Sequence, residues 1–147
     1  MKRHNRREKG FTLIEMLIVM VILGLLAALV GPRMFGKVGK SRQKAAKTQI
    51  TLFETALDTM KLDTGKYPTT GQGLQALRVK PDGVKRWDGP YLPKDIPLDP
   101  WGNVYDYRSP GEHGDCDITS YGADGTSGGE GEDEDIVSWK DPGGESR

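Results

Sequence analysis

A single acid inside a membrane-length apolar run constrains this chain more than any other feature of its sequence. In the 19 residues from Thr12 to Val30, Glu15 is the only charged side chain. A helix of about 20 residues spans the hydrocarbon core of a bilayer, whereas an acid at the centre of such a helix costs roughly 2.5–3.5 kcal/mol. The run therefore predicts a membrane helix in which Glu15 has a function that offsets this cost.

The charges of the chain are balanced in number but segregated along its length. Lys plus Arg and Asp plus Glu both number 21. Residues 1–10 carry five basic side chains and one acid, residues 33–47 carry six basic side chains and no acid, and nine acids but no Lys or Arg lie between Arg108 and Lys140. Basic residues before the apolar run favour a cytoplasmic N-terminus, which the second basic cluster partly opposes. We interpret that cluster as a solvated or subunit-facing surface rather than as a site for nucleic acid or phospholipid head groups.

Two simpler interpretations of the N-terminus are a secretory signal peptide and a plain signal anchor. The apolar run is long for a signal peptide, and residues 27–37, AALVGPRMFGK, offer only a weak cleavage site of small residues. A plain anchor explains the length of the run but not its acid. On the residues alone, both interpretations stay open.

The segment KGFTLIEMLIVMVILGLLAALVGP, from Lys9 to Pro32, resembles the class III signal of type IV pilins and type II secretion pseudopilins. The resemblance implies that a prepilin peptidase cuts between Gly10 and Phe11, that Phe11 becomes N-methylated, and that Glu15 is the family's glutamate. A carboxylate in an apolar phase needs a partner, and we expect none nearby in its own chain. We therefore expect Glu15 to neutralise the Phe11 amine of a neighbouring subunit in a filament.

A second helical pattern follows the apolar run. Its apolar positions recur at spacings of four and three, as on one face of an amphipathic helix: Ala46, Ile50, Phe53, Leu57 and Met60. Gly65 and Pro68 favour a helix end near Thr64. We expect one helix from about residue 11 to about residue 64, with a kink or a local loss of helix near Pro32. A helix that simply ends at Gly31 is the alternative.

The remainder of the chain predicts a small sheet. Three alternating runs are typical of short strands, NVYDY at 103–107, DITSY at 117–121 and DIVSW at 135–139. A short helical stretch is expected around 72–78, with Thr70 as its cap and with Leu74 and Leu77 facing inward. The fold class is thus α+β, a long N-terminal helix packed on a small antiparallel sheet.

These patterns define four regions. We expect a leader peptide at residues 1–10, a transmembrane and assembly helix at 11–31, the amphipathic second half of that helix at 32–64, and a loop-rich periplasmic region at 65–147.

Three segments of the last region make the family resemblance more specific. YPTTGQGLQAL, DPWGNVYDY and SYGADG resemble the major pseudopilins of type II secretion systems. The chain has one cysteine, Cys116, so it cannot form the disulfide-closed C-terminal loop of many pilins of the other branch. The resemblance implies a pilin-like fold over nearly the whole chain.

An acidic, glycine-rich segment from Tyr121 to Ile136, YGADGTSGGEGEDEDI, is the second chemically informative stretch. It holds six acids and five glycines, a composition that suits either a disordered loop or the oxygen ligands of Ca²⁺. The order of residues is not that of an EF-hand, and no His or Cys cluster suggests zinc.

The resemblance favours calcium in this loop. It implies a Ca²⁺ held by aspartates and main-chain carbonyls, which in this sequence are the carboxylates of Asp124, Asp133 and Asp135 and the carbonyls of Tyr121 and Thr126, with Glu132 and Glu134 as further candidates. Such a metal would stabilise the loop in place of a disulfide.

The sequence lacks the common catalytic motifs. His113 and Cys116 lie close together in PGEHGDCD, where a Cys–His dyad or a transition-metal site is conceivable, but a surface turn is the interpretation we favour. We expect no catalysis.

The resemblance implies a structural function. The chain would be the major subunit of a type II secretion pseudopilus, a homopolymer that drives export of folded proteins through the outer membrane. Its partners would be the prepilin peptidase, minor pseudopilins, an inner-membrane assembly platform with its ATPase, and the secretin, with no nucleic acid. It would be a single-pass inner-membrane protein with a periplasmic globular domain. The alternatives are a type IV pilus subunit and a monomeric, membrane-anchored calcium-binding module.

Overall fold

The computed structural model describes residues 10–140, without the side chains of residues 31–36. The chain divides into two compact units, Met1–Lys37 and Val38–Arg147. Most of the predicted leader, residues 1–9, lies outside the described residues.

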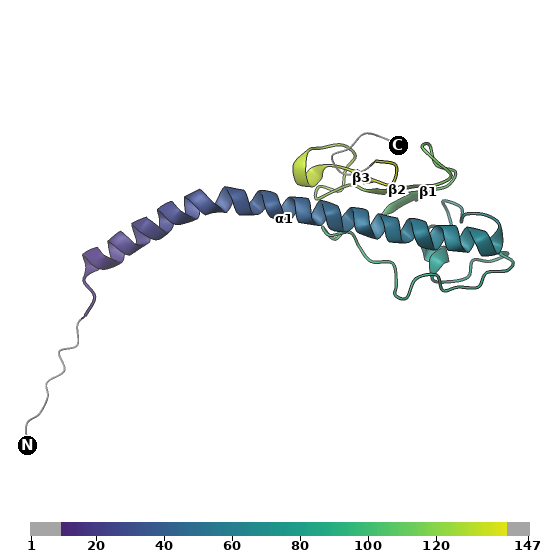
Figure 1. Ribbon diagram of the computed structural model, residues 1–147, viewed down its shortest axis with the longest axis horizontal. Coiled ribbons are helices and arrows are strands. Elements are labelled where there is room, and N and C mark those ends of the chain that lie inside the picture. The colour runs from purple at the N-terminus through teal and green to yellow at the C-terminus, as the bar shows by residue number, and fades with distance from the viewer. Residues whose placement is uncertain (1–9, 141–147) are drawn as a thin grey trace, which may run out of the picture. The chain divides into compact units, whose positions relative to one another are not determined.

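One long helix, α1 (Leu13–Thr64), runs through both units (Figure 1). It ends where predicted, because Gly65 adopts a φ of 84° and its amide donates to the carbonyl of Lys61 at 2.8 Å, as glycine does beyond many helix ends. The expected loss of helix near Pro32 is not found, since α1 is continuous there. A proline removes only one backbone donor from a helix, and the rest of this long helix keeps its own hydrogen bonds.

In the first unit, the apolar part of α1 is exposed. Residues Leu13–Val30 have a mean hydropathy of 2.9 and no buried side chain, and the side chain of Leu13 is 92% exposed. By length and composition this segment is able to span a membrane. No described residue of this unit covers it, so the segment needs an apolar partner or an apolar solvent.

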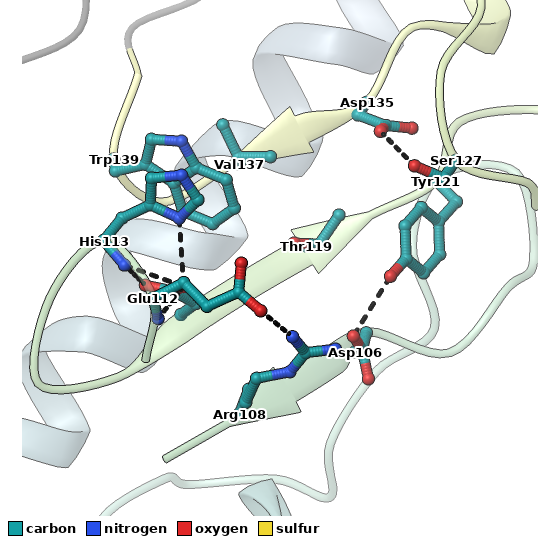
Figure 2. Close-up of a pocket in the computed structure, with 11 residues that line it drawn as sticks. Asp106, Arg108, Glu112, His113, Thr119, Tyr121, Ser127, Asp135, Val137 and Trp139 are labelled. Atoms are coloured by element: carbon teal, nitrogen blue, oxygen red, sulfur yellow. Dashed lines mark hydrogen bonds and ion pairs between the residues drawn. The ribbon is translucent and has the colours of Figure 1, made fainter. Parts of the chain in front are cut away.

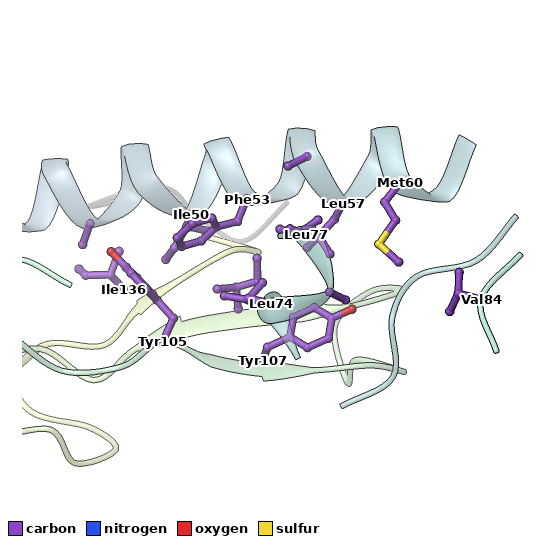
Figure 3. Packing of buried hydrophobic residues seen from close by; sticks show 14 residues of the cluster. Ile50, Phe53, Leu57, Met60, Leu74, Leu77, Val84, Tyr105, Tyr107 and Ile136 are labelled. Atoms are coloured by element: carbon purple, nitrogen blue, oxygen red, sulfur yellow. The ribbon is translucent and has the colours of Figure 1, made fainter. Parts of the chain in front are cut away.

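In the second unit, the predicted apolar face of α1 is the centre of the core (Figure 3). Ala46, Ile50 and Leu57 are completely buried. Partners for this face come from the short 3₁₀ helix η1 (Leu74–Leu77) and from the sheet. The ring of Phe53 packs edge-on against that of Tyr105, with centroids 5.1 Å apart. The core thus joins α1 to η1 and to the sheet.

Three antiparallel strands form the sheet, in the order β1 (Asp106–Arg108), β2 (Asp117–Ser120), β3 (Ile136–Val137) (Figure 1). Tyr107 pairs with Ile118, and Ser120 pairs with Ile136. Alternation of side chains puts Tyr107 and Ile118 in the core and leaves Asp106 and Arg108 exposed. The prediction of an α+β fold with a small antiparallel sheet is confirmed, although each strand is shorter than the run that predicted it.

The predicted cap of the short helix is wrong. η1 has Gly73 before it with no side-chain cap. Thr70 instead bridges to Ser109, because its hydroxyl donates to the Ser109 carbonyl at 3.1 Å and accepts from the Ser109 amide at 2.9 Å. A contact between segments that are distant in sequence has replaced the local one. Leu74 and Leu77 are buried, as predicted.

Candidate functional site

α1 begins with a capping box that includes Glu15. The amide and the hydroxyl of Thr12 donate to Glu15 Oε2 at 2.8 and 2.9 Å, and the amide of Glu15 donates to Thr12 Oγ1 at 3.3 Å. These reciprocal bonds satisfy donors that a helix leaves unpaired in its first turn. The expectation that Glu15 lacks a partner in its own chain is therefore wrong, and the T-x-x-E spacing is the sequence signal that predicts this one.

The predicted cleavage site directly precedes the capping box. Gly10 and Phe11 lie outside α1, and the Phe11 side chain is 80% exposed. No atom of the described chain lies within 4 Å of a Cβ built at Gly10. The fold itself therefore does not require glycine at position 10. Only another molecule that binds this segment could require it.

The acidic loop, residues 121–135, folds back on itself. The amide of Ala123 donates to the carbonyl of Glu132 at 2.9 Å. The loop has two arms, residues 121–129 and residues 130–135. Gly122 and Gly129 of the first arm both have positive φ. A Cβ on Gly122 would lie 2.7 Å from the carbonyl oxygen of Glu132, and one on Gly129 would lie 2.6 Å from that of Asp133. Only glycine fits both requirements. The two arms of the loop are therefore held in close contact.

Two of the predicted calcium ligands have carboxylates held inside this loop. Asp124 accepts from the amide and hydroxyl of Thr126 at 3.1 and 2.9 Å. Asp135 Oδ2 accepts from Ser127 Oγ at 3.4 Å, as Figure 2 shows, and from the amide of Gly128 at 3.0 Å. Asp135 Oδ1 is buried and has no hydrogen-bond partner within residues 10–140. Such an oxygen is unfavourable unless a donor or a cation completes it.

The other candidate carboxylates do not join these two. Glu132 faces Arg42 of α1 at 3.5 Å, and Glu134 accepts from Gln43 Nε2 at 3.3 Å. Asp133 lies in the short 3₁₀ helix η2 (Gly131–Asp133). Within residues 10–140, no three His, Cys, Asp or Glu side chains form a group able to hold a metal ion. A cation in this loop would therefore take main-chain carbonyls as well as carboxylates, and Ca²⁺ accepts such a ligand set.

A groove crosses the face of the sheet opposite the core (Figure 2). It is lined by Asp106, Arg108, Glu112, His113, Asp117, Thr119, Tyr121, Ser127, Asp135, Val137 and Trp139. Most of its polar side chains pair with one another: Arg108 with Glu112 at 2.5 Å, Tyr121 with Asp106 at 3.1 Å, and His113 with Asp117 at 3.1 Å. Because these side chains bind one another, the groove does not present a nucleophile next to a base.

His113 and Cys116 do not form a catalytic pair. The His113 ring stacks on Trp139, with centroids 3.8 Å apart and planes 5° apart, and its Nδ1 faces Asp117 rather than the thiol. Burial of the Cys116 thiol, followed by the negative charges of Glu54 and Asp58, raises its pKa from the usual 9.0 to about 11. A thiol in this state is a poor nucleophile.

We expect native Cys116 to react slowly with thiol reagents. At pH 8, a pKa of about 11 instead of 9.0 leaves about one hundredth of the thiolate. Alkylation of the folded chain by iodoacetamide should therefore be about a hundredfold slower than alkylation in denaturant. Mass spectrometry over time measures both rates, and equal rates would contradict the prediction.

The apolar helix with its capping box and the α+β unit define a subunit of the pilin-like class. A family model described as "Type II secretion system (T2SS), protein G" matches residues 33–139, and one described as "Prokaryotic N-terminal methylation motif" matches residues 5–31. The two matches together cover both halves of α1 and the globular unit.

Individual relatives agree with the family models. Type II secretion system core protein G of Vibrio cholerae is 48% identical over 91% of this chain and 93% of its own length, and that of Pseudomonas aeruginosa is 47% identical over 92% and 97%. A solved structure, the major pseudopilin from the type 2 secretion system of enterohaemorrhagic Escherichia coli, matches with a TM-score of 0.59 and 37% identity, over 74% of this chain and 95% of that one.

The chain belongs to the type II secretion system protein G family. The predicted resemblance and the pilin-like fold are confirmed. As a member of this family the chain is a structural secretion subunit, a pseudopilin, and neither a type IV pilus subunit nor a monomeric calcium-binding module is favoured.

Proposed function

We propose that this chain is the main subunit of a type II secretion pseudopilus, which polymerises in the periplasm and drives folded proteins through the outer membrane. The main support for this proposal is that the chain combines the two parts of a pseudopilin. An exposed apolar helix, Leu13–Val30, begins at a capping box, and a folded unit with its own core resembles a solved major pseudopilin. An apolar helix of this length is stable only in a bilayer or against other such helices.

The membrane anchor and the partners follow from the same features. We place the helix in the inner membrane with a cytoplasmic N-terminus, because five basic residues precede it. The prepilin peptidase would then reach the exposed Gly10–Phe11 bond and release the amine of Phe11, which is methylated. Minor pseudopilins, the assembly platform with its ATPase, and the secretin are the further partners that this function requires.

In the assembled filament, we place Glu15 opposite the Phe11 amine of a neighbouring subunit. Both hydrogen bonds from Thr12 end on Glu15 Oε2, so that Oε1 stays accessible to a further donor. The capping box also fixes the carboxylate beside the new N-terminus. A charge that is costly in the bilayer and paired in the filament would set the axial position of each subunit.

In the acidic loop, we propose a Ca²⁺ site. The buried Oδ1 of Asp135 without a donor is the structural support for it, and Asp124, whose neighbour Ala123 bonds to the Glu132 carbonyl, would supply a second carboxylate. Asp133 and the carbonyls of Tyr121 and Thr126 would complete the ligand set, whereas Glu132 and Glu134 contact α1. A bound cation would neutralise part of the loop's charge and hold its two arms together.

Deletion of the gene tests the secretory function. We expect folded exoproteins to accumulate in the periplasm, because no other subunit would form the body of the filament, while type IV pili in the same cells stay normal. Immunoblots of the periplasm and the medium measure the first result, and twitching or pilus counts measure the second. Normal secretion, or a defect confined to pili, would contradict the proposal.

A further inference from the structure

One face of α1 contacts the chain segment that ends the acidic loop. Gly39, Gln43 and Lys47 are spaced four residues apart and so share one face of the helix. Gln43 Nε2 donates to the carbonyl of Gly131 at 2.5 Å and to Glu134 at 3.3 Å. A Cβ on Gly39 would lie 2.8 Å from the side chain of Glu132. The loop therefore packs directly on the helix backbone.

Lys47 extends this contact to the strand that follows. Its ammonium donates to the carbonyls of Val137, Ser138 and Lys140 at 2.8, 3.0 and 2.6 Å. An ammonium has three donors, so each of these three carbonyls receives one. The chain from the loop to the end of the sheet is thus fixed to a single helix face.

The segment held by Gln43 lies between the two carboxylates of the proposed cation site. Glu132 lies between Gly131 and Glu134, the two residues that Gln43 binds. Its carbonyl accepts a hydrogen bond from the amide of Ala123, which directly precedes Asp124. Asp135 directly follows Glu134. A shift of this segment away from α1 would therefore move Asp124 and Asp135 together with it.

The hydrogen bonds within the segment that Gln43 contacts give it only weak local support. Within η2 and at its end, the amide of Asp133 donates to Glu130 at 3.2 Å and that of Glu134 donates to Gly131 at 3.3 Å, both long bonds. Gly128, Gly129 and Gly131 have positive φ, and glycine loses more conformational freedom on ordering than any other residue. A contact made before ligand binding reduces the ordering that binding must complete.

We propose that Gln43 is a positioning residue for the cation site of the acidic loop, and that cation binding and the contact between α1 and the loop stabilise each other. This inference rests on the calcium site proposed above. Linkage makes the effect reciprocal: if the contact raises the affinity of the loop for Ca²⁺, Ca²⁺ strengthens the contact by the same factor. The state of the loop would then be transmitted to α1 at residues 39–47, within the helix that carries the membrane segment.

The test uses the full chain in detergent micelles and CaCl₂ as the ligand. Gln43→Met keeps the length of the side chain and removes its donor. Calorimetric titration should show a Kd about threefold to tenfold higher than that of the wild type, the range that one net hydrogen bond corresponds to. Thr48→Met, at an exposed position on α1, is the matched control and should keep the wild-type Kd.

Hydrogen exchange provides the reciprocal measurement. In the wild type, Ca²⁺ should slow exchange of the amides of residues 39–47, and this effect should be smaller in Gln43→Met. A contact that is merely structural would lower the melting temperature in chelator but leave the Kd unchanged. Calcium binding with an equal Kd in the wild type and Gln43→Met would overturn the positioning role alone. A wild-type chain that binds no calcium would overturn the calcium site and the positioning role together.

Discussion

Glu15→Gln should abolish filament assembly while leaving α1 and its capping box intact. Glutamine serves as well as glutamate at the third position of a capping box, so both hydrogen bonds from Thr12 are retained. The negative charge is lost, and the Phe11 amine of the neighbouring subunit is left without its counter-ion. Removal of one partner of a buried ion pair typically costs about 3–5 kcal/mol, which weakens each subunit contact by a factor of roughly 10² to 4 × 10³.

Two further measurements separate charge from helix capping. Electron microscopy of sheared filaments gives the yield for Glu15→Gln, and the mass of the mature chain shows whether the cut after Gly10 and the methylation still occur. Thr12→Val removes the hydroxyl of the capping box but keeps the charge, so it should assemble. Filaments at wild-type yield in Glu15→Gln would show that no ion pair is needed.

Calcium removal should lower the melting temperature of the full chain by about 10 °C. A ligand present at about 1,000 times its Kd stabilises the folded state by about 4 kcal/mol, and each kcal/mol shifts the midpoint of a domain of this size by a few degrees. Without the cation, Asp135 Oδ1 has no partner and the acids of the loop repel one another. Tryptophan fluorescence in CaCl₂ and in EGTA measures the two midpoints.

Variants of the loop acids locate this effect. Asp124→Ala and Asp135→Asn should each melt at the same temperature with and without EGTA. Glu130→Gln removes an acid of the same loop that we do not place among the ligands, and should keep the difference. The same midpoint for the wild type in CaCl₂ and in EGTA would refute the calcium site.

The sequence predicted most accurately those features that depend on periodicity. The stripe from Ala46 to Met60 identified the face of α1 that is buried, and alternation identified all three strands. Both patterns report which side of an element faces the core, so they hold whatever the partner is. The end of α1 was equally local, because Gly65 alone supplies the conformation that terminates the helix.

The features that the sequence did not predict depend on contacts between distant segments. Lys47 belongs to a cluster that we interpreted as a solvated or subunit-facing surface, yet its ammonium binds carbonyls about ninety residues further along the chain. The family resemblance gave Glu132 and Glu134 as further candidate calcium ligands, but in the structure they pair with Arg42 and Gln43 of α1. No local pattern indicates which of several neighbouring acids turns inward. The capping box is different, because the T-x-x-E spacing of Thr12 and Glu15 is a local signal for it.

The single thiol, Cys116, has a consequence for the bonds that can form between subunits of the proposed filament. In the pseudopilus that we propose, every subunit would bring one cysteine, and in an oxidising compartment chance disulfides could join neighbouring subunits covalently. Cys116 is half-buried, and burial followed by the charges of Glu54 and Asp58 raises the pKa of its thiol to about 11, which disfavours the thiolate that would attack a neighbouring subunit. We therefore expect the subunits of such a filament to be joined by non-covalent contacts alone, so that a released subunit would carry no covalent link to its neighbours.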